Sequence, residues 1–386
     1  MRIGVLTSLY PAPTRPFEGI FAERRWRGMA DRGHEVSVVQ PLPRTPGPLA
    51  RGAWAEIRDM PAREVRHGIP VDRPRYWHWP GRSAGNAERF ARAGTAVLCA
   101  GGVRPDVVVA DYAWPAASAV DAVGACGVPF VISGRGSDVL QVAGIAELRL
   151  VLARCLTRSA GWVGVSQDLV DAMDGLAERP GTGALVPNGV DLERFAPGDR
   201  GAARERLGLA REGTLTLVVG HLIERKDPLL ALEAFARAAG TEARLVFLGR
   251  GPLREDLERS VAARGLTARV SILGEVPPEE LQWWYRACDC LLLTSSREGR
   301  PNVVLEALAS GRPVVATDAG GTRELLAGMD GALVLDRDPE SIAKSLRRTL
   351  EASWDAAALR ERVGHLSWEK SCETLESYLE QRRAAA

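Results

Sequence analysis

Residues 295–311 read SSREGRPNVVLEALASG and predict a loop followed by a helix. Short apolar runs at 290–294 and 313–317 flank this segment, as expected for strands in the middle of a parallel sheet. We expect the helix from Asn302 to Ala309, with Pro301 in its first turn. The free N–H groups at the start of such a helix, together with its dipole, favour a phosphate group. The segment therefore predicts a ligand cradle at the edge of a sheet.

Two carboxylates of this segment, Glu298 and Glu306, are eight residues apart. On one continuous helix they would lie about 80° apart, so they are not expected to share a face. With Glu298 in the loop and Glu306 inside the helix, they could instead meet two ends of an elongated polyol ligand, because carboxylates accept hydrogen bonds from hydroxyl groups. Gly299 lets the backbone come close to that ligand. The alternative is a loop acid near a helix start and a solvated helical glutamate.

The length of 386 residues and the hydrophobic content of 46% predict two domains, each with a sizeable core. Charged residues make up 26% and the net charge is +1, so no overall field points to nucleic acid. Residues 1–104 hold 17 Arg, no Lys and 9 acidic residues, a surplus of +8 that leaves −7 for the rest. This surplus is either a basic patch for an anionic acceptor or membrane surface, or a chance distribution over solvated faces.

The six cysteines, at 99, 126, 155, 288, 290 and 372, show no paired C-x2-C spacing and are expected to be buried free thiols. No apolar run approaches the length of a membrane span, and the chain runs from Met1 directly into a strand without a leader segment. We therefore expect a cytoplasmic protein. Peripheral contact of this protein with the inner face of the membrane is compatible with that location.

Strand and helix patterns alternate along the chain. The first series begins with a strand at 3–7, a proline-rich loop to Gly19, a helix at 20–31 and a strand at 35–39, without the G-x-G-x-x-G of dinucleotide sites. The remaining strands are expected at 106–110, 128–133, 162–165 and 184–186, and in a second series at 215–219, 244–248, 270–273, 290–294, 313–317 and 332–335. Residues 41–85, which include Trp54, Trp77 and Trp79, predict an irregular segment at a cleft or surface. The alternation implies an α/β protein with parallel sheets covered on both faces.

Several segments together resemble one known family. Glu298 and Glu306 within EGRPNVVLEALASGRPVVAT look like the E-x7-E signature of the GT4 family of retaining, GT-B-fold glycosyltransferases. Other segments resemble the same family in the same order: RGHEV at 32–36, RGSD at 135–138, GVSQDL at 164–169, PNGVDLERFAP at 187–197, VGHLIERKDP at 219–228 and LGRGPLREDLE at 248–258.

The resemblance implies two Rossmann-like, doubly wound parallel-sheet domains that face a central cleft. Residues 1–197 would form the N-terminal, acceptor-side domain, to which a C-terminal crossover helix at 368–386 returns. Residues 198–367 would form the nucleotide-sugar-binding domain. A short breaker at 196–199 could act as the hinge.

The segment from Gly220 to Asp227 follows the first strand of the second series, where open α/β sheets bind ligands. Lys226 matches the phosphate-binding lysine of the family. The chain has only three lysines, at 226, 344 and 370, and a compact ammonium can bridge two phosphates where a planar guanidinium fits less well. The alternative is a solvated loop lysine. His221 departs from the family, which usually has Arg there, so part of the diphosphate charge would fall to Arg225, His221 or backbone donors.

Residues 133–138 form a first-domain cluster, in which Arg135 stands where family members often have His. Arginine cannot act as a base, but it can clamp a phosphate or a polar acceptor. Asp138 is either a helix N-cap or an acceptor-side residue. Trp77 and Trp79, together with the arginines of residues 1–104, favour a lipid-linked or otherwise anionic acceptor, unless the two indoles anchor a loop in the core.

Two further patterns have structural explanations. Asp336-Arg337-Asp338 spells the D-x-D of metal-dependent sugar transferases, but Asp338-Pro339-Glu340 is a typical helix start, so we expect no metal site there. Trp283-Trp284-Tyr285 lies in a helical pattern and predicts core packing rather than base stacking.

The resemblance implies a retaining, metal-independent transferase that moves a sugar from a nucleotide-diphosphate sugar to an acceptor hydroxyl, in cell-surface polysaccharide or glycolipid synthesis, with no cofactor beyond that co-substrate. Glu298 would hold sugar hydroxyls and Glu306 the ribose. The alternatives are a catalytically impaired nucleotide-sugar-binding protein, suggested by Arg135 and His221, and a sugar phosphorylase or epimerase. The expected site comprises catalytic Lys226, Arg225 and Glu298; donor-binding Gly220, His221, Gly249, Arg250, Gly251, Glu275, Gly299, Arg300, Pro301, Asn302, Val303 and Glu306; and acceptor-side Gly19, Arg135, Asp138, Trp77 and Trp79.

Overall fold

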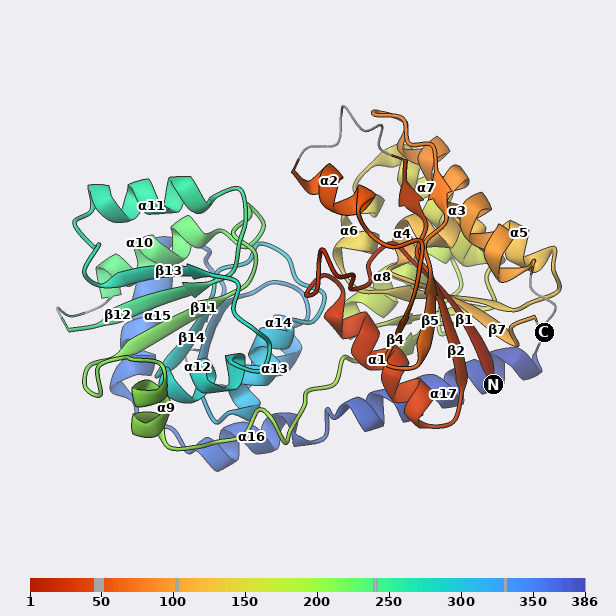
Figure 1. Cartoon of the computed structure of the whole chain (residues 1–386). Helices are drawn as coiled ribbons and strands as arrows, with labels where there is room; N and C mark the ends of the chain where they lie inside the picture. The colour runs from red at the N-terminus through yellow and green to blue at the C-terminus, as the bar shows by residue number, and fades with distance from the viewer. Residues whose placement is uncertain (45–51, 101–103, 239, 241, 330–331, 386) are drawn as a thin grey trace. The chain divides into compact units, whose positions relative to one another are not determined.

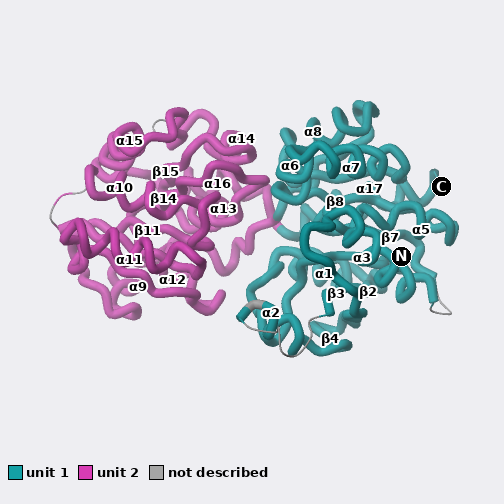
Figure 2. The backbone as a smooth tube through the Cα atoms, turned by 90° about the horizontal axis from the view of Figure 1, so that it is seen from above, with its two compact units in different colours: residues 1–188, 368–386 teal, residues 189–367 magenta. Residues whose placement is uncertain are grey.

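The computed structural model describes all residues except 45–51, 101–103, 239, 241, 330–331 and 386. The chain forms two compact units, shown in separate colours in Figure 2. Unit 1 comprises Met1–Asn188 and Trp368–Ala386, and unit 2 comprises Gly189–Ser367. The sequence-based boundary at 197 and the breaker at 196–199 lie inside unit 2, where the Asp199 carboxylate caps the next helix by accepting from the Ala202 N–H.

Among the described residues of unit 1, eight strands form one sheet in the order β10-β9-β8-β7-β1-β2-β5-β4. Figure 1 labels β1, β2, β4, β5 and β7 of this sheet. The bounds are Arg2–Thr7 for β1, Glu35–Val39 for β2, Arg63–Arg66 for β4, Ile69–Asp72 for β5, Val107–Asp111 for β7, Phe130–Gly134 for β8, Gly161–Gly164 for β9 and Ala184–Leu185 for β10. All neighbouring pairs are parallel except β4 with β5. The predicted parallel sheet thus gains one antiparallel strand at this edge, where a tight turn connects β4 and β5.

Helices cover both faces of the unit 1 sheet. Successive residues of a strand point to opposite faces, and apolar side chains on both faces of this sheet are buried under helices. Val5 packs on the side of α1 (Ile20–Asp31) and α17 (Trp368–Ala384), whereas Leu6 packs on the opposite side. That side is covered by α3 (Ser83–Leu98), α4 (Ala113–Ala116), η2 (Ala117–Ala119), α5 (Val120–Gly124), α6 (Ser137–Ala143), α7 (Ala146–Arg158) and α8 (Gln167–Ala177). The C-terminal helix α17 thus completes the core of the N-terminal unit, as the GT-B resemblance predicted.

Among the described residues of unit 2, six parallel strands form a sheet in the order β13-β12-β11-β14-β15-β16. The bounds are Leu215–Val219 for β11, Arg244–Leu248 for β12, Val270–Gly274 for β13, Cys290–Leu293 for β14, Val314–Thr317 for β15 and Leu333–Val334 for β16. One face is covered by α9 (Arg200–Arg206), α12 (Leu281–Ala287), α13 (Asn302–Ala309), α14 (Thr322–Leu326) and α16 (Ala356–Gly364). The other is covered by α10 (Pro228–Ala238), α11 (Arg254–Ala263) and α15 (Pro339–Glu351).

The segment 41–85 is more regular than predicted. Strand β3 (Leu42–Pro43) pairs with β6 (Arg75–Tyr76), β5 joins the main sheet, and α2 (Ala53–Arg58) contributes to a small apolar cluster. Residues 45–51 of this segment lie outside the described residues. The strands were missed because they are short and interrupted by proline and glycine.

All six cysteines are free thiols, as predicted, but only four of them are buried. Cys99 and Cys126 are partly exposed, which corrects the expectation for these two residues. Within the described part of the chain, no helix is both long enough and apolar enough to cross a membrane.

Two loops at the carboxyl edge of the unit 2 sheet touch through their backbones. Gly249, after β12, has φ +146°, and a Cβ atom there would lie 1.9 Å from the Gly220 carbonyl oxygen. Gly251 is equally tight, since its Cβ would lie 2.2 Å from the Leu222 oxygen. Both glycines are therefore required by the close approach of the loops that follow β11 and β12.

We expect Gly249→Ala to lower the melting temperature of unit 2, because the alanine would combine backbone strain of about 1–3 kcal/mol with a steric clash. Gly364→Ala is the matched control, since a Cβ at Gly364, in α16, meets nothing within 4 Å. Thermal unfolding by circular dichroism measures both variants. An unchanged melting temperature for Gly249→Ala would contradict the close approach.

Candidate active site

The candidate site lies where the strand order of the unit 2 sheet reverses. Strands β11 and β14 are neighbours, with β12 and β13 on one side and β15 and β16 on the other. The loops that leave β11 and β14 therefore meet at the carboxyl edge, the position at which open α/β sheets bind ligands. The Ser296 N–H donates to the Arg225 carbonyl oxygen at 2.8 Å, and the Thr294 hydroxyl donates to the Lys226 carbonyl oxygen at 3.0 Å. These two hydrogen bonds to backbone carbonyl oxygens join the two sequence-predicted clusters.

The three predicted catalytic side chains form one ion cluster. The Lys226 Nζ atom lies 2.5 Å from Glu298 Oε1, and the Arg225 Nη1 atom lies 3.3 Å from Glu298 Oε2. Burial alone would raise the pKa of Glu298, which is 8% exposed, but Lys226 and Arg225 hold it below its usual value. The carboxylate is therefore ionised. Two cations face one anion, so this cluster carries a net positive charge.

Helix α13 begins directly after this cluster. Pro301 has an extended backbone (φ −74°, ψ 110°) and occupies the N-cap, so its predicted position in the first turn is wrong by one residue. The Pro301 side chain makes no capping hydrogen bond. The first helical residues, Asn302 and Val303, therefore present the positive end of the helix dipole at the same sheet edge as Lys226.

Glu306 lies one turn inside α13 and is only 9% exposed. Its Oε2 atom accepts a hydrogen bond of 2.9 Å from the Tyr285 hydroxyl. The alternative of a solvated helical glutamate is therefore wrong. Glu298 lies in the loop and Glu306 in the helix, as the spacing argument required.

A third loop contributes to the site and was not predicted. A Cβ at Gly320 would lie 2.2 Å from the Glu298 carbonyl oxygen, and the Gly321 N–H donates to the Gly299 oxygen at 3.0 Å. Arg300 also reaches this region, pairing with Glu324 at 3.0 Å. The signal in the sequence was the Gly-Gly pair just after the strand at 314–317, which permits such a backbone contact.

The remaining donor-side residues lie on the same edge. Gly220 and His221 follow β11, and Arg250 follows β12. Arg250 pairs with Glu275, which follows β13, at 3.0 Å. His221, Arg250 and Glu275 are exposed. The structure therefore places all predicted donor-side residues of unit 2 on loops at the carboxyl ends of β11, β12, β13 and β14, or at the start of α13.

The predicted acceptor-side Arg135 is occupied by partners within unit 1. Its guanidinium forms two hydrogen bonds of 2.8 Å to Asp111, the last residue of β7, and a third of 2.7 Å to the Asn188 side chain. Burial would raise the pKa of Asp111, but Arg135 holds it below the usual value. The Trp26 indole N–H also donates to Asp111, at 2.7 Å. With 8% exposure, Arg135 is mainly a buried ion-pair partner rather than an exposed clamp.

Asp138 is a structural residue, although not as the N-cap. It is the second residue of α6, whose N-cap is Gly136, and its carboxylate accepts from the Arg135 N–H at 3.0 Å and the Ala113 N–H at 2.6 Å. Burial raises its pKa to about 6. Gly19 is the N-cap of α1 with φ +77°, and a Cβ there would lie 2.7 Å from the Leu9 oxygen. Its conformation therefore requires glycine.

The tryptophans of residues 41–85 lie on the surface. Trp77 and Trp79 are each 56% exposed and Trp54 is 43% exposed, so the alternative of core anchors is wrong. The Trp54 and His78 rings lie 5.9 Å apart, and the Arg44 guanidinium lies 5.3 Å from the Trp77 ring centre. We call Trp54, Trp77, Trp79 and Arg44 the tryptophan patch.

The helix start at Asp338 and the core packing of Trp284 and Tyr285 are confirmed, whereas Trp283 is only partly buried. The Asp338 carboxylate caps α15, accepting from the Glu340 and Ser341 N–H groups, with Pro339 in the first turn. Trp284 and Tyr285 are buried in the unit 2 core. Within the described ranges, no three His, Cys, Asp or Glu side chains gather as a metal site would require.

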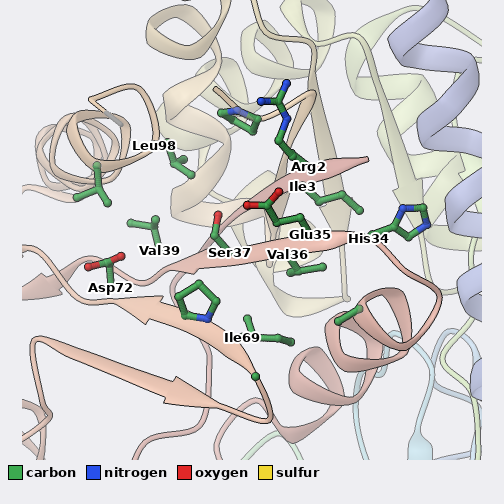
Figure 3. Close-up of a pocket in the computed structure, with 15 residues that line it drawn as sticks. Arg2, Ile3, His34, Glu35, Val36, Ser37, Val39, Ile69, Asp72 and Leu98 are labelled. Atoms are coloured by element: carbon green, nitrogen blue, oxygen red, sulfur yellow. The ribbon is translucent and has the colours of Figure 1, made fainter. Parts of the chain in front are cut away.

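A pocket of about 410 Å³ lies elsewhere, in unit 1 (Figure 3). Glu35, Ser37 and Val39 of β2, Ile69 and Asp72 of β5, and Leu98 of α3 line it. None of the predicted site residues belongs to it. Asp72 is paired with Arg63, and Arg2 with Asp106, so the charges of this pocket are largely compensated within unit 1.

Two glycosyltransferase family models match this chain, one over most of each unit. The Glycosyltransferase Family 4 model matches residues 22–194, and the Glycosyl transferases group 1 model matches residues 199–365. In structure, a sucrose-phosphate synthase of Thermosynechococcus elongatus has a TM-score of 0.82 at 20% identity, with full coverage of both chains. The Anabaena protein HepE, solved with UDP and glucose, has a TM-score of 0.77 at 18% identity over 99% of this chain and 100% of its own. At these identities the structures show the fold alone.

The fold is therefore the GT-B fold of glycosyltransferases. Together, the two family models account for both units, and the chain belongs to the family 4 glycosyltransferases. In sequence, glycosyltransferase TuaC of Bacillus subtilis, named for teichuronic acid biosynthesis, is 28% identical over 90% of this chain and 89% of its own. A D-inositol 3-phosphate glycosyltransferase of Acidothermus cellulolyticus is 32% identical over 64% of this chain and 58% of its own.

The raised pKa of Asp138 predicts a pH-dependent contribution to stability. The folded state holds this proton up to about pH 6, whereas the unfolded chain releases it near 3.8. The contribution is therefore present below pH 3.8 and is lost as pH rises to about 6, by on the order of 2–3 kcal/mol. We expect the stability of Asp138→Asn relative to wild type to increase between pH 4 and 7. Denaturant unfolding across this range measures the difference, and a flat difference would contradict the raised pKa.

Proposed function

We propose that the protein transfers a sugar from a nucleotide-diphosphate sugar to an acceptor hydroxyl, with retention of the anomeric configuration and without a metal ion. The ion cluster of Lys226, Arg225 and Glu298 at the reversal point of the unit 2 sheet is the observation that carries this proposal. Its surplus positive charge, with the start of α13 beside it, suits a diphosphate.

The chemistry follows from where charge develops. As the bond from the sugar to the diphosphate breaks, negative charge grows on the leaving phosphate, and preorganised donors stabilise that charge more than the ground state. Lys226, Arg225 and the N–H groups of α13 would supply these donors. The leaving phosphate itself could take the proton of the acceptor hydroxyl. Glu298 would keep Lys226 and Arg225 in place and contact sugar hydroxyls, and Glu306 would contact the ribose.

The relatives support a role in making a cell-surface polysaccharide or glycolipid. TuaC is named for teichuronic acid biosynthesis, and another structure of the same fold, at 17% identity and a TM-score of 0.68, is a lipopolysaccharide outer core galactosyltransferase. The structural neighbours were solved with UDP in one case and with ADP in another. UDP-, ADP- and GDP-sugars are therefore the first donors to test.

Incubation with these donors and an extract of cell-envelope acceptors, with and without a chelator, tests the proposal. We expect a glycosylated product and a free nucleoside diphosphate, an anomeric configuration by NMR that matches the donor, and no loss of activity in the chelator. Product formation only from a sugar 1-phosphate would identify a phosphorylase instead. An inverted product, or activity that requires manganese, would contradict the corresponding part of the proposal.

We expect Lys226→Ala to reduce turnover by about two decades or more with the fold intact, since a donor to a developing oxyanion is typically worth about 3 kcal/mol. Lys226→Arg should recover little, because a planar guanidinium does not reproduce the contact geometry of an ammonium. Lys344→Ala, which removes an exposed lysine of α15, is the matched control. Near-normal turnover in Lys226→Ala would contradict the phosphate assignment.

We also propose a cytoplasmic location with peripheral contact to an anionic membrane, through the tryptophan patch. Three exposed indoles offer apolar surface, and Arg44 adds positive charge beside Trp77. Indole rings favour the membrane interface, and basic side chains are attracted to anionic lipids. This contact would bring a lipid-linked acceptor within reach of the enzyme.

Sedimentation with vesicles tests this contact. Binding should be stronger to anionic than to neutral vesicles and should fall as salt rises, because exposed charges are screened within about 8 Å at physiological ionic strength. Trp77→Ala with Trp79→Ala should weaken binding and raise the acceptor KM, whereas Leu150→Ala, a change at another exposed apolar residue of unit 1, should not. Equal binding to both kinds of vesicle would exclude the proposed contact.

A further inference from the structure

Tyr285 joins the core of unit 2 to the candidate site. It lies in α12, which packs against α13, and the residue is 0% exposed. Its ring packs edge-on against Phe195, with centroids 5.6 Å apart and planes at 81°. The hydroxyl at the other end of the ring donates to Glu306 Oε2 at 2.9 Å. One side chain thus fills the core with its ring and reaches a predicted ligand-binding carboxylate with its polar tip.

The hydroxyl is not required for packing. A phenylalanine would make the same edge-on contact with Phe195, and burying a hydroxyl costs free energy unless it is hydrogen-bonded. The Glu306 carboxylate in turn requires hydrogen-bond donors, because it is only 9% exposed. A hydrogen bond to an ionised acceptor is also stronger than one between neutral groups. The pair therefore satisfies both buried groups and restricts the carboxylate to one orientation.

The phenol remains a donor over the whole physiological pH range. Burial, and then the neighbouring Glu306 carboxylate, raise the pKa of Tyr285 well above its usual value. The proton therefore stays on the phenol oxygen and is shared with Glu306 Oε2. The second oxygen, Oε1, is not the atom that receives this hydrogen bond.

We propose that Tyr285 is a positioning residue that orients the Glu306 carboxylate for binding the nucleoside part of the donor. The inference rests on the proposed function, in which Glu306 contacts the ribose. Tyr285 touches neither donor nor acceptor in this role and acts only through Glu306. Since a ribose contact exists before, during and after the transfer, the loss of Tyr285 should affect donor binding and leave the chemical step nearly unchanged.

Calorimetric titration of the full chain tests the inference. Wild-type protein is first titrated with UDP, ADP and GDP, and the nucleotide that binds most tightly is then used for all variants. We expect Tyr285→Phe to weaken nucleoside diphosphate binding about tenfold, as the loss of one hydrogen bond to a charged group implies. The donor KM should rise by a similar factor with little change in kcat. Binding of inorganic pyrophosphate, which lacks the ribose, should stay unchanged.

A double-mutant cycle separates positioning from general damage to the core. Tyr285→Phe should cause no further loss in a Glu306→Gln background, because the group through which it acts has already been altered. Tyr378→Phe is the matched control, since it removes another buried hydroxyl, one that donates to the Thr182 oxygen in unit 1. It should leave nucleotide binding unchanged.

Wild-type affinity in Tyr285→Phe, a loss that adds fully to that of Glu306→Gln, or an equal loss of pyrophosphate binding would each overturn the inference. These outcomes differ from a failure of the proposed function. If wild-type protein bound none of UDP, ADP and GDP, the donor assignment itself would be wrong.

Discussion

The ion pair of Lys226 with the buried Glu298 carboxylate is the interaction on which the candidate site depends. A carboxylate that is 8% exposed is costly unless opposite charges stay within contact distance, so the loops after β11 and β14 must remain together. Hydrogen bonds from the Ser296 N–H and the Thr294 hydroxyl to backbone carbonyl oxygens hold the same two loops. The strand order makes this possible, because β11 and β14 are neighbours although 70 residues separate Cys290 from Gly220. The ion pair and these hydrogen bonds therefore hold the two loops together.

Unit 1 uses the same design at its own carboxyl edge. Asp111 is the last residue of β7, which lies next to β1 where the order of that sheet reverses, and Arg135 follows the adjacent strand β8. Trp26 and Asn188 complete the hydrogen bonding of the pair. In both units the strand interiors are apolar and buried on two faces, and charged side chains concentrate where the strands end. The middle of each strand thus contributes to the core, and the residues at its carboxyl end contribute to the candidate site, as is typical of open α/β sheets.

The helices behind the site also serve it. Tyr285 belongs to the core by its ring and to the site by its hydroxyl, and Gly320 and Gly321 support Glu298 and Gly299 through backbone contacts. None of these residues stands near Glu298 or Glu306 in the sequence. These contacts keep the side chains of the site oriented before a ligand binds. The free-energy cost of ordering them on binding is therefore smaller.

The sequence alone was sufficient for the fold class, and it predicted residues that the structure brings together at one edge of the unit 2 sheet. Alternating apolar runs predicted β2, β11 and β12 to the residue, and the E-x7-E and Lys226 segments indicated the family. Local signals were sufficient in these cases because strand periodicity, helix caps and glycine positions act over a few residues. They failed for β4 and for the helix position of Asp138, where short elements carry little periodic signal.

Only the tertiary structure decided which side chains meet. Arg135 was predicted as a clamp for an acceptor, yet Asp111, 24 residues away, occupies its guanidinium. Tyr285 was predicted as core, and its hydroxyl proved to reach Glu306 on another helix. Trp77 and Trp79 could have been either buried or exposed, and the structure places them on the surface. The physical reason is that partners of buried polar groups are chosen by strand order and helix packing, which join residues distant in the chain and leave no mark on local composition.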